Sequence, residues 1–287
     1  MEFNFIYVVQ SLRPGEKATG ARLHEEELQG LLEELASVGA EIGSELVNVA
    51  GRRDLLDFLE RVRNEVGSIG RFPVLHVEIH GTDDKTGLRL ASGEFVPWSD
   101  LVSPLTAINA EMRNNLFLTL AVCSGAYLAQ ILSAAHPAPF WGLVGPHDRE
   151  WDGVLLDGFT AFYKVFLTEL DGRKALHALR EATDAAQANA KYLFFDAEST
   201  FRKAFRAYVE QKCSAEAVET RLKWISEQAR GLDALTKEQR EALTADVRDR
   251  MLDPRPAFQD FRRVHFMIDK FPENDARFPM TFEEVMG

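Results

Sequence analysis

The sequence predicts an α/β protein with an open, mostly parallel sheet that has helices on both faces. Short runs of β-branched and aromatic residues alternate with amphipathic helical segments over residues 1–195, which is the pattern of consecutive strand–helix–strand units. The run at 115–123 is almost continuously apolar, as expected for a central strand covered on both faces. From residue 196 onward charged helical segments dominate. We therefore expect an α/β domain at 1–195 and a helical extension at 196–287 that packs on it.

Strands and helices are expected to alternate along the chain. The expected strands are 3–10, 45–51, 74–81, 115–123, 140–145 and a possible sixth at 192–197, with a small hairpin formed by 88–90 and 94–96. After the first strand, a helix is indicated by an apolar stripe of Leu28, Leu31, Leu32, Leu35 and Val38.

Turn and capping residues mark several helix ends. The glycines of 67–70 close the second helix, and Ser99 is the expected N-cap of a helix that follows the hairpin. In the extension, helices are expected to start at Thr236 and near Pro256. The residues from 271 to the end contain enough Pro and Asn to predict a tail that packs irregularly.

Composition limits the classes of function. The formal net charge is -12 and the pI is near 5.1, which opposes binding to a phosphate backbone, so no direct nucleic-acid partner is expected. No glycine-rich phosphate loop follows the first strand, and no cofactor is expected. Cys123 and Cys213 show neither a disulfide framework nor zinc-ligand spacing. The sequence has no basic leader and no apolar run near the roughly 18 residues that cross a bilayer, which predicts a cytoplasmic protein without membrane contact.

The stretch VLHVEIHG at 74–81 combines an apolar strand with titratable residues. Alternation places Val74, His76, Glu78 and His80 on one face of the strand. Ligands on open parallel sheets bind at the carboxyl ends of the strands. His80 stands at such an end, directly before Gly81.

Cys123 is the second candidate for chemistry, because it closes the apolar run at 115–123. A thiolate is a good nucleophile when a nearby group lowers its pKa or removes its proton, and a helix N-terminus together with a histidine does both. We expect a helix to begin at Ser124 and Gly125, with free backbone N–H groups that steady the thiolate. Cys123 and His80 therefore form a candidate catalytic dyad.

These segments resemble a known family. The stretches VLHVEIHG, GLRLASGEFVPWSDL, NLFLTLAVCSGAYL and FWGLVGPHDREWDGVLLDGFTAFYKVFLTELDGRKALHALREA are similar, in this order, to the core of CHAT-type caspase-like cysteine peptidases, relatives of caspases and separase. The resemblance covers about residues 70–185. Its specific parts are the H-x-x-x-H-G strand end, the cysteine after an apolar strand, and the aromatic helix that contains FY. Val122 is a departure, since Ala or Asp is more usual before the cysteine.

The resemblance implies a caspase-like fold and a cysteine endopeptidase with a protein substrate. By that resemblance His80 is the general base, Cys123 is the nucleophile, and the backbone amides of Gly81 and Cys123 are the oxyanion donors. His76 is expected to support the strand end. Bacterial members of the family often cut a partner protein in regulated defence systems after an upstream protein activates them.

Substrate preference remains open between two alternatives. Caspase-like enzymes that cut after an acidic residue use arginine, for which Arg13 in the loop after the first strand is a candidate. Relatives that cut after a basic residue use an acidic pocket, and the chain's negative charge favours this alternative. The candidate acids are Asp83, Asp84, Asp148, Glu150, Asp152 and Asp157.

Two other functions compete with the peptidase hypothesis. His76, Glu78 and His80 share a strand face and would form a metal site if they converged on one ion. The fold would alternatively serve as a non-catalytic caspase-like scaffold that binds a partner through its helical C-terminal part. The presence of both His80 and Cys123 favours catalysis over the scaffold.

Overall fold

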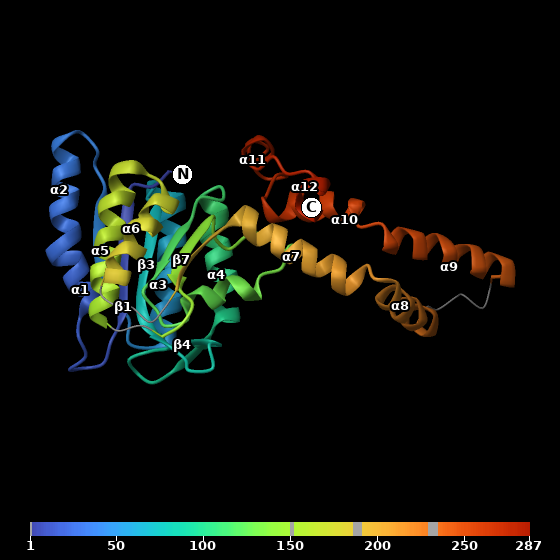
Figure 1. Ribbon diagram of the computed structural model, residues 1–287, viewed down its shortest axis with the longest axis horizontal. Helices are drawn as coiled ribbons and strands as arrows, with labels where there is room; N and C mark the ends of the chain where they lie inside the picture. The colour runs from blue at the N-terminus through green and yellow to red at the C-terminus, as the bar shows by residue number, and fades with distance from the viewer. Residues whose placement is uncertain (1, 150–151, 186–190, 229–234) are drawn as a thin grey trace. The chain divides into compact units, whose positions relative to one another are not determined.

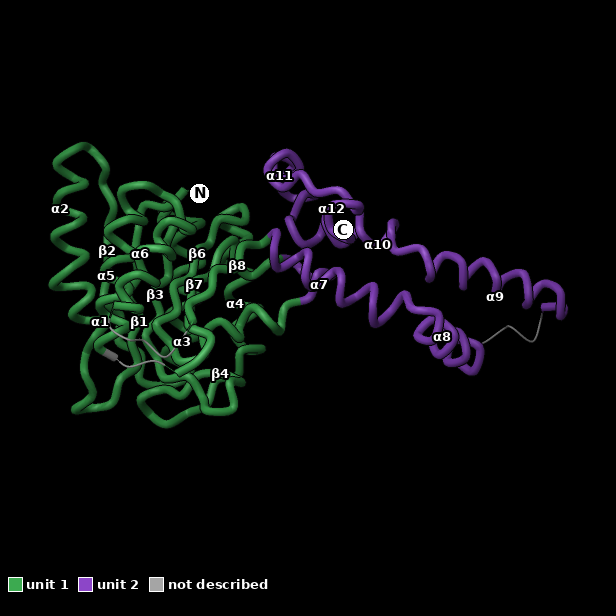
Figure 2. The backbone as a smooth tube through the Cα atoms, in the orientation of Figure 1, with its two compact units in different colours: residues 1–132, 138–197 green, residues 133–137, 198–287 purple. Residues whose placement is uncertain are grey.

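The computed structural model describes residues 2–149, 152–185, 191–228 and 235–287 (Figure 1). The described chain divides into two compact units (Figure 2). Unit 1 comprises 1–132 and 138–197, and unit 2 comprises 133–137 and 198–287. The main boundary thus follows Ala197, where the sequence prediction placed it after residue 195.

Unit 1 is built on a mostly parallel sheet, as the sequence predicted. The order of the main strands is β2-β1-β3-β6-β7-β8. All neighbours in this order are parallel except β8, which runs antiparallel to β7. The strands are β1 (Phe5–Ser11), β2 (Gly43–Asn48), β3 (Pro73–Gly81), β6 (Phe117–Leu120), β7 (Gly142–Pro146) and β8 (Tyr192–Asp196).

The strand register extends β3 beyond its neighbour β6, the strand that precedes Cys123. Val77 of β3 is paired with Leu120, the last residue of β6, and β3 continues to Gly81. The expected strand at 115–123 is therefore much shorter, although the Ala121 amide still bonds to the Val77 carbonyl at 2.9 Å. The predicted hairpin is confirmed as β4 (Gly87–Arg89) and β5 (Phe95–Pro97), and β4 pairs with the extended end of β3.

Helices cover both faces of this sheet (Figure 1). Apolar residues of α3 (Arg52–Ile69), α4 (Trp98–Glu111) and the 3-10 helix η2 (Gly125–Ile131) pack on one face. The other face is covered by α1 (Thr19–Arg22), the π-helix η1 (Leu23–Leu28), α2 (Gln29–Ser37), α5 (Asp152–Glu169) and α6 (Gly172–Ala185).

Aromatic residues fill the core beneath α5. Phe159, Phe162, Tyr163 and Phe166 are fully or almost fully buried, and the ring of Phe166 stacks on Phe117 of β6 at 4.9 Å between centroids. Aromatic pairs of this kind contribute beyond their buried area. The rings therefore fix α5 against the central strands that carry the candidate site.

Two local predictions about helices in unit 1 were wrong. Val38 is not part of the apolar stripe, because α2 ends at Ser37 and the Val38 side chain is 78% exposed. Ser99 does not cap α4, because the helix already begins at Trp98 with Pro97 as its N-cap. Pro97 has no side-chain acceptor, and within the described chain no side-chain hydrogen bond caps this helix.

The regular secondary structure of unit 2 is helical in its described residues from 198 on, and the described segments between the helices are turns and loops. Its helices are α7 (Ala197–Lys212), α8 (Ala215–Gln228), α9 (Lys237–Leu252), α10 (Arg255–His265), α11 (Glu273–Arg277) and α12 (Phe282–Met286), although the first residue of α7 belongs to unit 1. Thr236 caps α9 and Pro256 lies in the first turn of α10, as predicted. The prediction of an irregular tail was wrong, because the segment from 271 contains α11 and α12 and buries Phe278, Met280 and Val285.

Candidate active site

Side chains on β3 alternate between the two cores, as the sequence predicted. Leu75 and Ile79 belong to the core under α3 and α4, whereas Val74 belongs to the core under α5. His76 and Glu78 are on the same face as Val74 and are buried, and His80, at the strand end, is partly exposed. The only member of this face that both reaches solvent and has a titratable ring is therefore His80.

Gly81 lies directly against the backbone of Cys123. A methyl group added to the Gly81 Cα would lie 1.9 Å from the Cys123 carbonyl oxygen and 3.3 Å from its Cβ. The φ angle of Gly81 is not in the left-handed region, so the requirement for glycine here comes from this close approach. His80 and Cys123, the residues of the predicted dyad, are 43 residues apart in sequence, and the chain segments that carry them thus meet.

His80 and Cys123 line the same cavity. The other residues that line it include Glu16, Lys17, Thr19 and Glu78. Within the described chain the His80 ring bonds through Nε2, to Glu16, and Nδ1 is the nitrogen that remains to accept a proton from the thiol. Catalytic hydrogen bonds are often long in resting enzymes and tighten in the substrate complex. A hydrogen bond between Nδ1 and the Cys123 sulfur stays a prediction.

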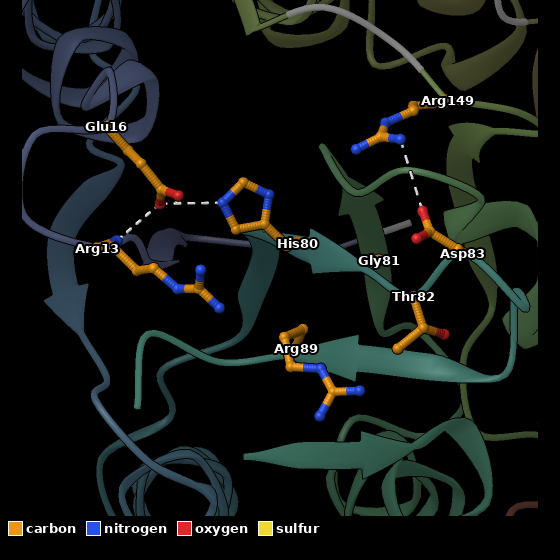
Figure 3. A pocket seen from close by; sticks show the side chains of 8 residues that line it. All are labelled: Arg13, Glu16, His80, Gly81, Thr82, Asp83, Arg89 and Arg149. Carbon is orange, nitrogen blue, oxygen red and sulfur yellow. Dashed lines mark hydrogen bonds and ion pairs between the residues drawn. The ribbon is translucent and has the colours of Figure 1, made fainter. Parts of the chain in front are cut away.

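Glu16 is a site residue that the sequence reasoning missed. Its Oε2 lies 2.9 Å from His80 Nε2 and 2.7 Å from the Arg13 amide nitrogen (Figure 3). The hydrogen bond from His80 is the largest cause that lowers the pKa of Glu16 below its ordinary value. A signal was present in the sequence, because Arg13-Pro14-Gly15-Glu16 is a turn motif at the carboxyl end of the first strand.

The backbone after Cys123 differs from the predicted helix N-terminus. The chain forms the 3-10 helix η2, preceded by Ser124 in the left-handed conformation with a φ of 59°. The amides of Ser124 and Gly125 are not free, because they bond to the carbonyls of Asp148 and Val122. The prediction that these two N–H groups steady the thiolate was therefore wrong.

A polar cluster surrounds Asp148, whose carbonyl holds the Ser124 amide. Lys85 Nζ lies 3.0 Å from Asp148 Oδ1 and 3.3 Å from the Tyr127 hydroxyl, and His147 Nδ1 lies 3.0 Å from Asp148 Oδ2. The hydrogen bonds from His147 and, next, from Lys85 lower the pKa of Asp148. Asp148 thus links the loop before β4 to the turn that carries the nucleophile, and no spacing in the sequence indicated this cluster.

His80 and Glu16 also line a second cavity (Figure 3). It has a volume of about 400 Å³ and is lined by Arg13, Glu16, His80, Gly81, Thr82, Asp83, Arg89 and Arg149. Asp83 forms a long ion pair of 3.5 Å with Arg149, and both of these side chains are highly exposed. Arg13, predicted as a substrate-pocket residue, therefore lies beside the candidate base together with two further arginines.

The structure describes the side chains of four of the six candidate acids, and these four are not gathered into one pocket. Of the four, Asp83 lines the cavity beside His80, while Asp84 accepts hydrogen bonds from the amide and hydroxyl of Thr86. Asp157 is exposed on α5 and does not line either cavity next to His80. Glu150 lies outside the described residues, and Asp152 begins α5. The described lining of the cavity beside His80 contains three arginines and two carboxylates, those of Glu16 and Asp83.

His76 has a structural environment. It is fully buried, its Nδ1 lies 2.9 Å from the Thr119 hydroxyl, and its ring contacts Phe159 edge-on. Burial lowers the pKa of His76 to about 3, so the ring is neutral at ordinary pH. These contacts tie β3 to β6 and α5.

The three residues of the metal alternative have separate partners. His76 bonds to Thr119, Glu78 accepts from Thr19, and His80 bonds to Glu16. Among the residues that the structure describes, no group of three His, Cys, Asp or Glu side chains is arranged to hold a metal ion.

None of the described helices combines the length and apolar character that crossing a membrane requires.

Comparison with known proteins adds no family assignment. No protein-family model matches the chain, and no curated protein matches it.

Proposed function

We propose that this protein is a cysteine endopeptidase of the CHAT-type caspase-like kind, with Cys123 as nucleophile and His80 as base. The observation that carries the proposal is the contact between Gly81 and Cys123. Through this contact the side chains of His80 and Cys123 line one cavity at the carboxyl edge of the sheet. This edge is where parallel α/β sheets bind ligands. The family resemblance of residues 70–185 supports the same assignment.

The reaction begins with transfer of the Cys123 thiol proton to Nδ1 of His80. The sulfur then bonds to the carbonyl carbon of the substrate, and the resulting oxyanion is held by the amides of Gly81 and Cys123. The C–N bond breaks as His80 returns the proton to the leaving amine, which leaves a thioester. Water adds to the thioester and gives a proton to His80, the C–S bond breaks, and the sulfur recovers its proton.

The substrate residue at the cut is acidic in this proposal. Three guanidinium groups, those of Arg13, Arg89 and Arg149, line the cavity beside His80. Guanidinium groups bind carboxylates through paired hydrogen bonds. Glu16 and Asp83 also line this cavity, so its described side chains include three guanidinium groups and two carboxylates. We take this local excess of positive charge to outweigh the weak argument from the negative charge of the whole chain, because salt screens distant charges.

Labelling with an electrophilic peptide probe tests the nucleophile. We expect the probe to modify Cys123 and His80→Ala to abolish that modification. Cys213 is an internal control, because burial raises the pKa of its thiol and keeps it protonated. Equal labelling of both cysteines, or none at Cys123, contradicts the peptidase proposal and favours the non-catalytic scaffold.

Profiling with a peptide library tests the substrate preference. Wild type is expected to cut after Asp or Glu, Cys123→Ala is expected to be inactive, and Arg13→Ala is expected to cut more slowly. Arg22→Ala is the matched control, since Arg22 is exposed on α1 and pairs with Glu26. Cleavage after Arg or Lys would contradict the proposed pocket without contradicting the nucleophile.

We extend the proposal to biological context on the family resemblance alone. The substrate is a partner protein in a bacterial defence system, and an upstream protein activates the peptidase. Mass spectrometry of a lysate from the host organism, treated with wild type or Cys123→Ala, would identify such a substrate by new N-termini present in the wild-type sample only.

A further inference from the structure

The turn after β1 delivers one carboxylate to the ring of His80. The Glu16 amide donates to the Arg13 carbonyl at 3.1 Å, and Gly15 between them has a φ of 90°. Proline at the second position and a glycine with positive φ at the third are the requirements of a type II turn. Glu16 Oε2 in turn accepts from the Arg13 amide, so the side chain is fastened to its own turn. Little conformational freedom remains for the carboxylate that meets His80.

The hydrogen bond that Glu16 accepts determines which nitrogen of His80 carries a proton. An ionised carboxylate only accepts hydrogen bonds, so the Nε2 that lies 2.9 Å away must be the protonated nitrogen. The lone pair of the neutral ring is then on Nδ1. This is the tautomer that a base needs if it is to take the thiol proton through Nδ1.

We propose that Glu16 is a positioning residue of the active site, which fixes the Nε2–H tautomer of His80 and stabilises the imidazolium that forms when the ring takes the proton of Cys123. The proposal rests on the proposed function and adds a third member to the Cys–His pair. Glu16 would act on His80 as a buried aspartate acts on the catalytic histidine of a Ser-His-Asp triad.

Other charged groups surround the ring, but their role is different. The two cavities that His80 lines are also lined by Arg13, Lys17, Glu78, Asp83, Arg89 and Arg149. Among these described residues and Glu16, it is Glu16 that hydrogen-bonds to the ring. The others are four cations and two carboxylates that line the cavities.

The magnitude is set by the exposure of the pair. The His80 side chain is 41% exposed and that of Glu16 is 32% exposed, so solvent screens their interaction. A buried aspartate behind a catalytic histidine accounts for about 10⁴ in rate. For this half-exposed pair we expect a smaller effect, about 10-fold to 100-fold in the reactivity of Cys123 near pH 7.

The test measures the rate of Cys123 alkylation by iodoacetamide as a function of pH, in the full chain. Glu16→Gln preserves an oxygen that accepts from the Arg13 amide, so the turn is kept while the charge is removed. We expect this variant to react about 10-fold to 100-fold more slowly near pH 7, with the midpoint of the pH profile shifted upward. Glu26→Gln, which changes an exposed carboxylate on η1, is the matched control and should follow the wild-type profile.

The combination with His80→Ala separates positioning from general disruption. If Glu16 acts through the ring, Glu16→Gln has no further effect in the His80→Ala background. A wild-type profile for Glu16→Gln, or an equal loss in the presence and absence of His80, overturns the inference for Glu16. If His80→Ala itself leaves the alkylation profile of Cys123 unchanged, the proposed function fails instead, so the two failures are distinguishable.

Discussion

Substitution of Gly81 by alanine is a direct test of the contact that builds the site. The added methyl group would lie 1.9 Å from the Cys123 carbonyl oxygen and 2.9 Å from its carbonyl carbon. Both are backbone atoms, so a change of side-chain rotamer cannot relieve the overlap. The end of β3 and the turn at Cys123 must therefore move apart.

The size of the movement follows from the geometry. Contacts of a Cβ below 3.0 Å are essentially never observed, so the two backbones have to separate by about 1 Å or more. Misplacement of a catalytic group by about 1 Å can cost on the order of 10²-fold in rate. Forcing an extra methylene into a packed site typically costs about 1–3 kcal/mol of stability. We expect a folded variant with greatly reduced reactivity.

The assay pairs chemical denaturation with labelling of Cys123 by the electrophilic peptide probe. Gly81→Ala should lower the free energy of unfolding by about 1–3 kcal/mol and slow labelling by about 100-fold. Gly30→Ala is the matched control, because a Cβ at Gly30 of α2 meets no atom within 4 Å and alanine favours the helix. A Gly81→Ala protein with wild-type stability and wild-type labelling would refute the inferred contact between the two strand ends.

Substitutions at three further positions test other parts of the structure. Burial lowers the pKa of His76 from 6.5 to about 3, so between these pH values the unfolded chain binds more protons than the folded chain. The free energy of unfolding therefore falls as the pH drops through this window. Between pH 7 and pH 5, urea unfolding should show the wild type losing about 2 kcal/mol more of this free energy than His76→Gln. In unit 2, Phe205 is fully buried against Phe201 and Phe258, and Phe205→Ala should lower the unfolding free energy measured by circular dichroism by about 3–5 kcal/mol. Ser124 has a φ of 59°, so Ser124→Gly should keep Cys123 labelling and relieve about 1 kcal/mol of backbone strain. Ser124→Val should lose both stability and labelling. A valine variant that is more stable and better labelled than the glycine variant would contradict the left-handed turn.

The sequence by itself predicted the mostly parallel sheet of unit 1 and indicated the two residues of the proposed dyad. The alternation of VLHVEIHG assigned His80 to the solvent-reaching end of one strand face, because successive side chains in a strand point to opposite faces. Alternating apolar strands and amphipathic helices predicted the parallel sheet for the same local reason. Periodicity and capping depend on near neighbours in the chain, and a single sequence contains that information.

Only the tertiary structure decided which groups meet at the strand ends. Glu16 and His80 are 64 residues apart, and the arginines beside the ring come from three separate loops or strands. The amides of Ser124 and Gly125 looked available in the sequence but are occupied, one of them by the carbonyl of Asp148. Such pairings depend on strand order, register and the paths of loops between elements, and local sequence patterns specify none of these. For that reason the sequence indicated the two side chains of the proposed dyad, whereas the partner of His80 and the charged residues of the neighbouring cavity became visible only in the folded chain.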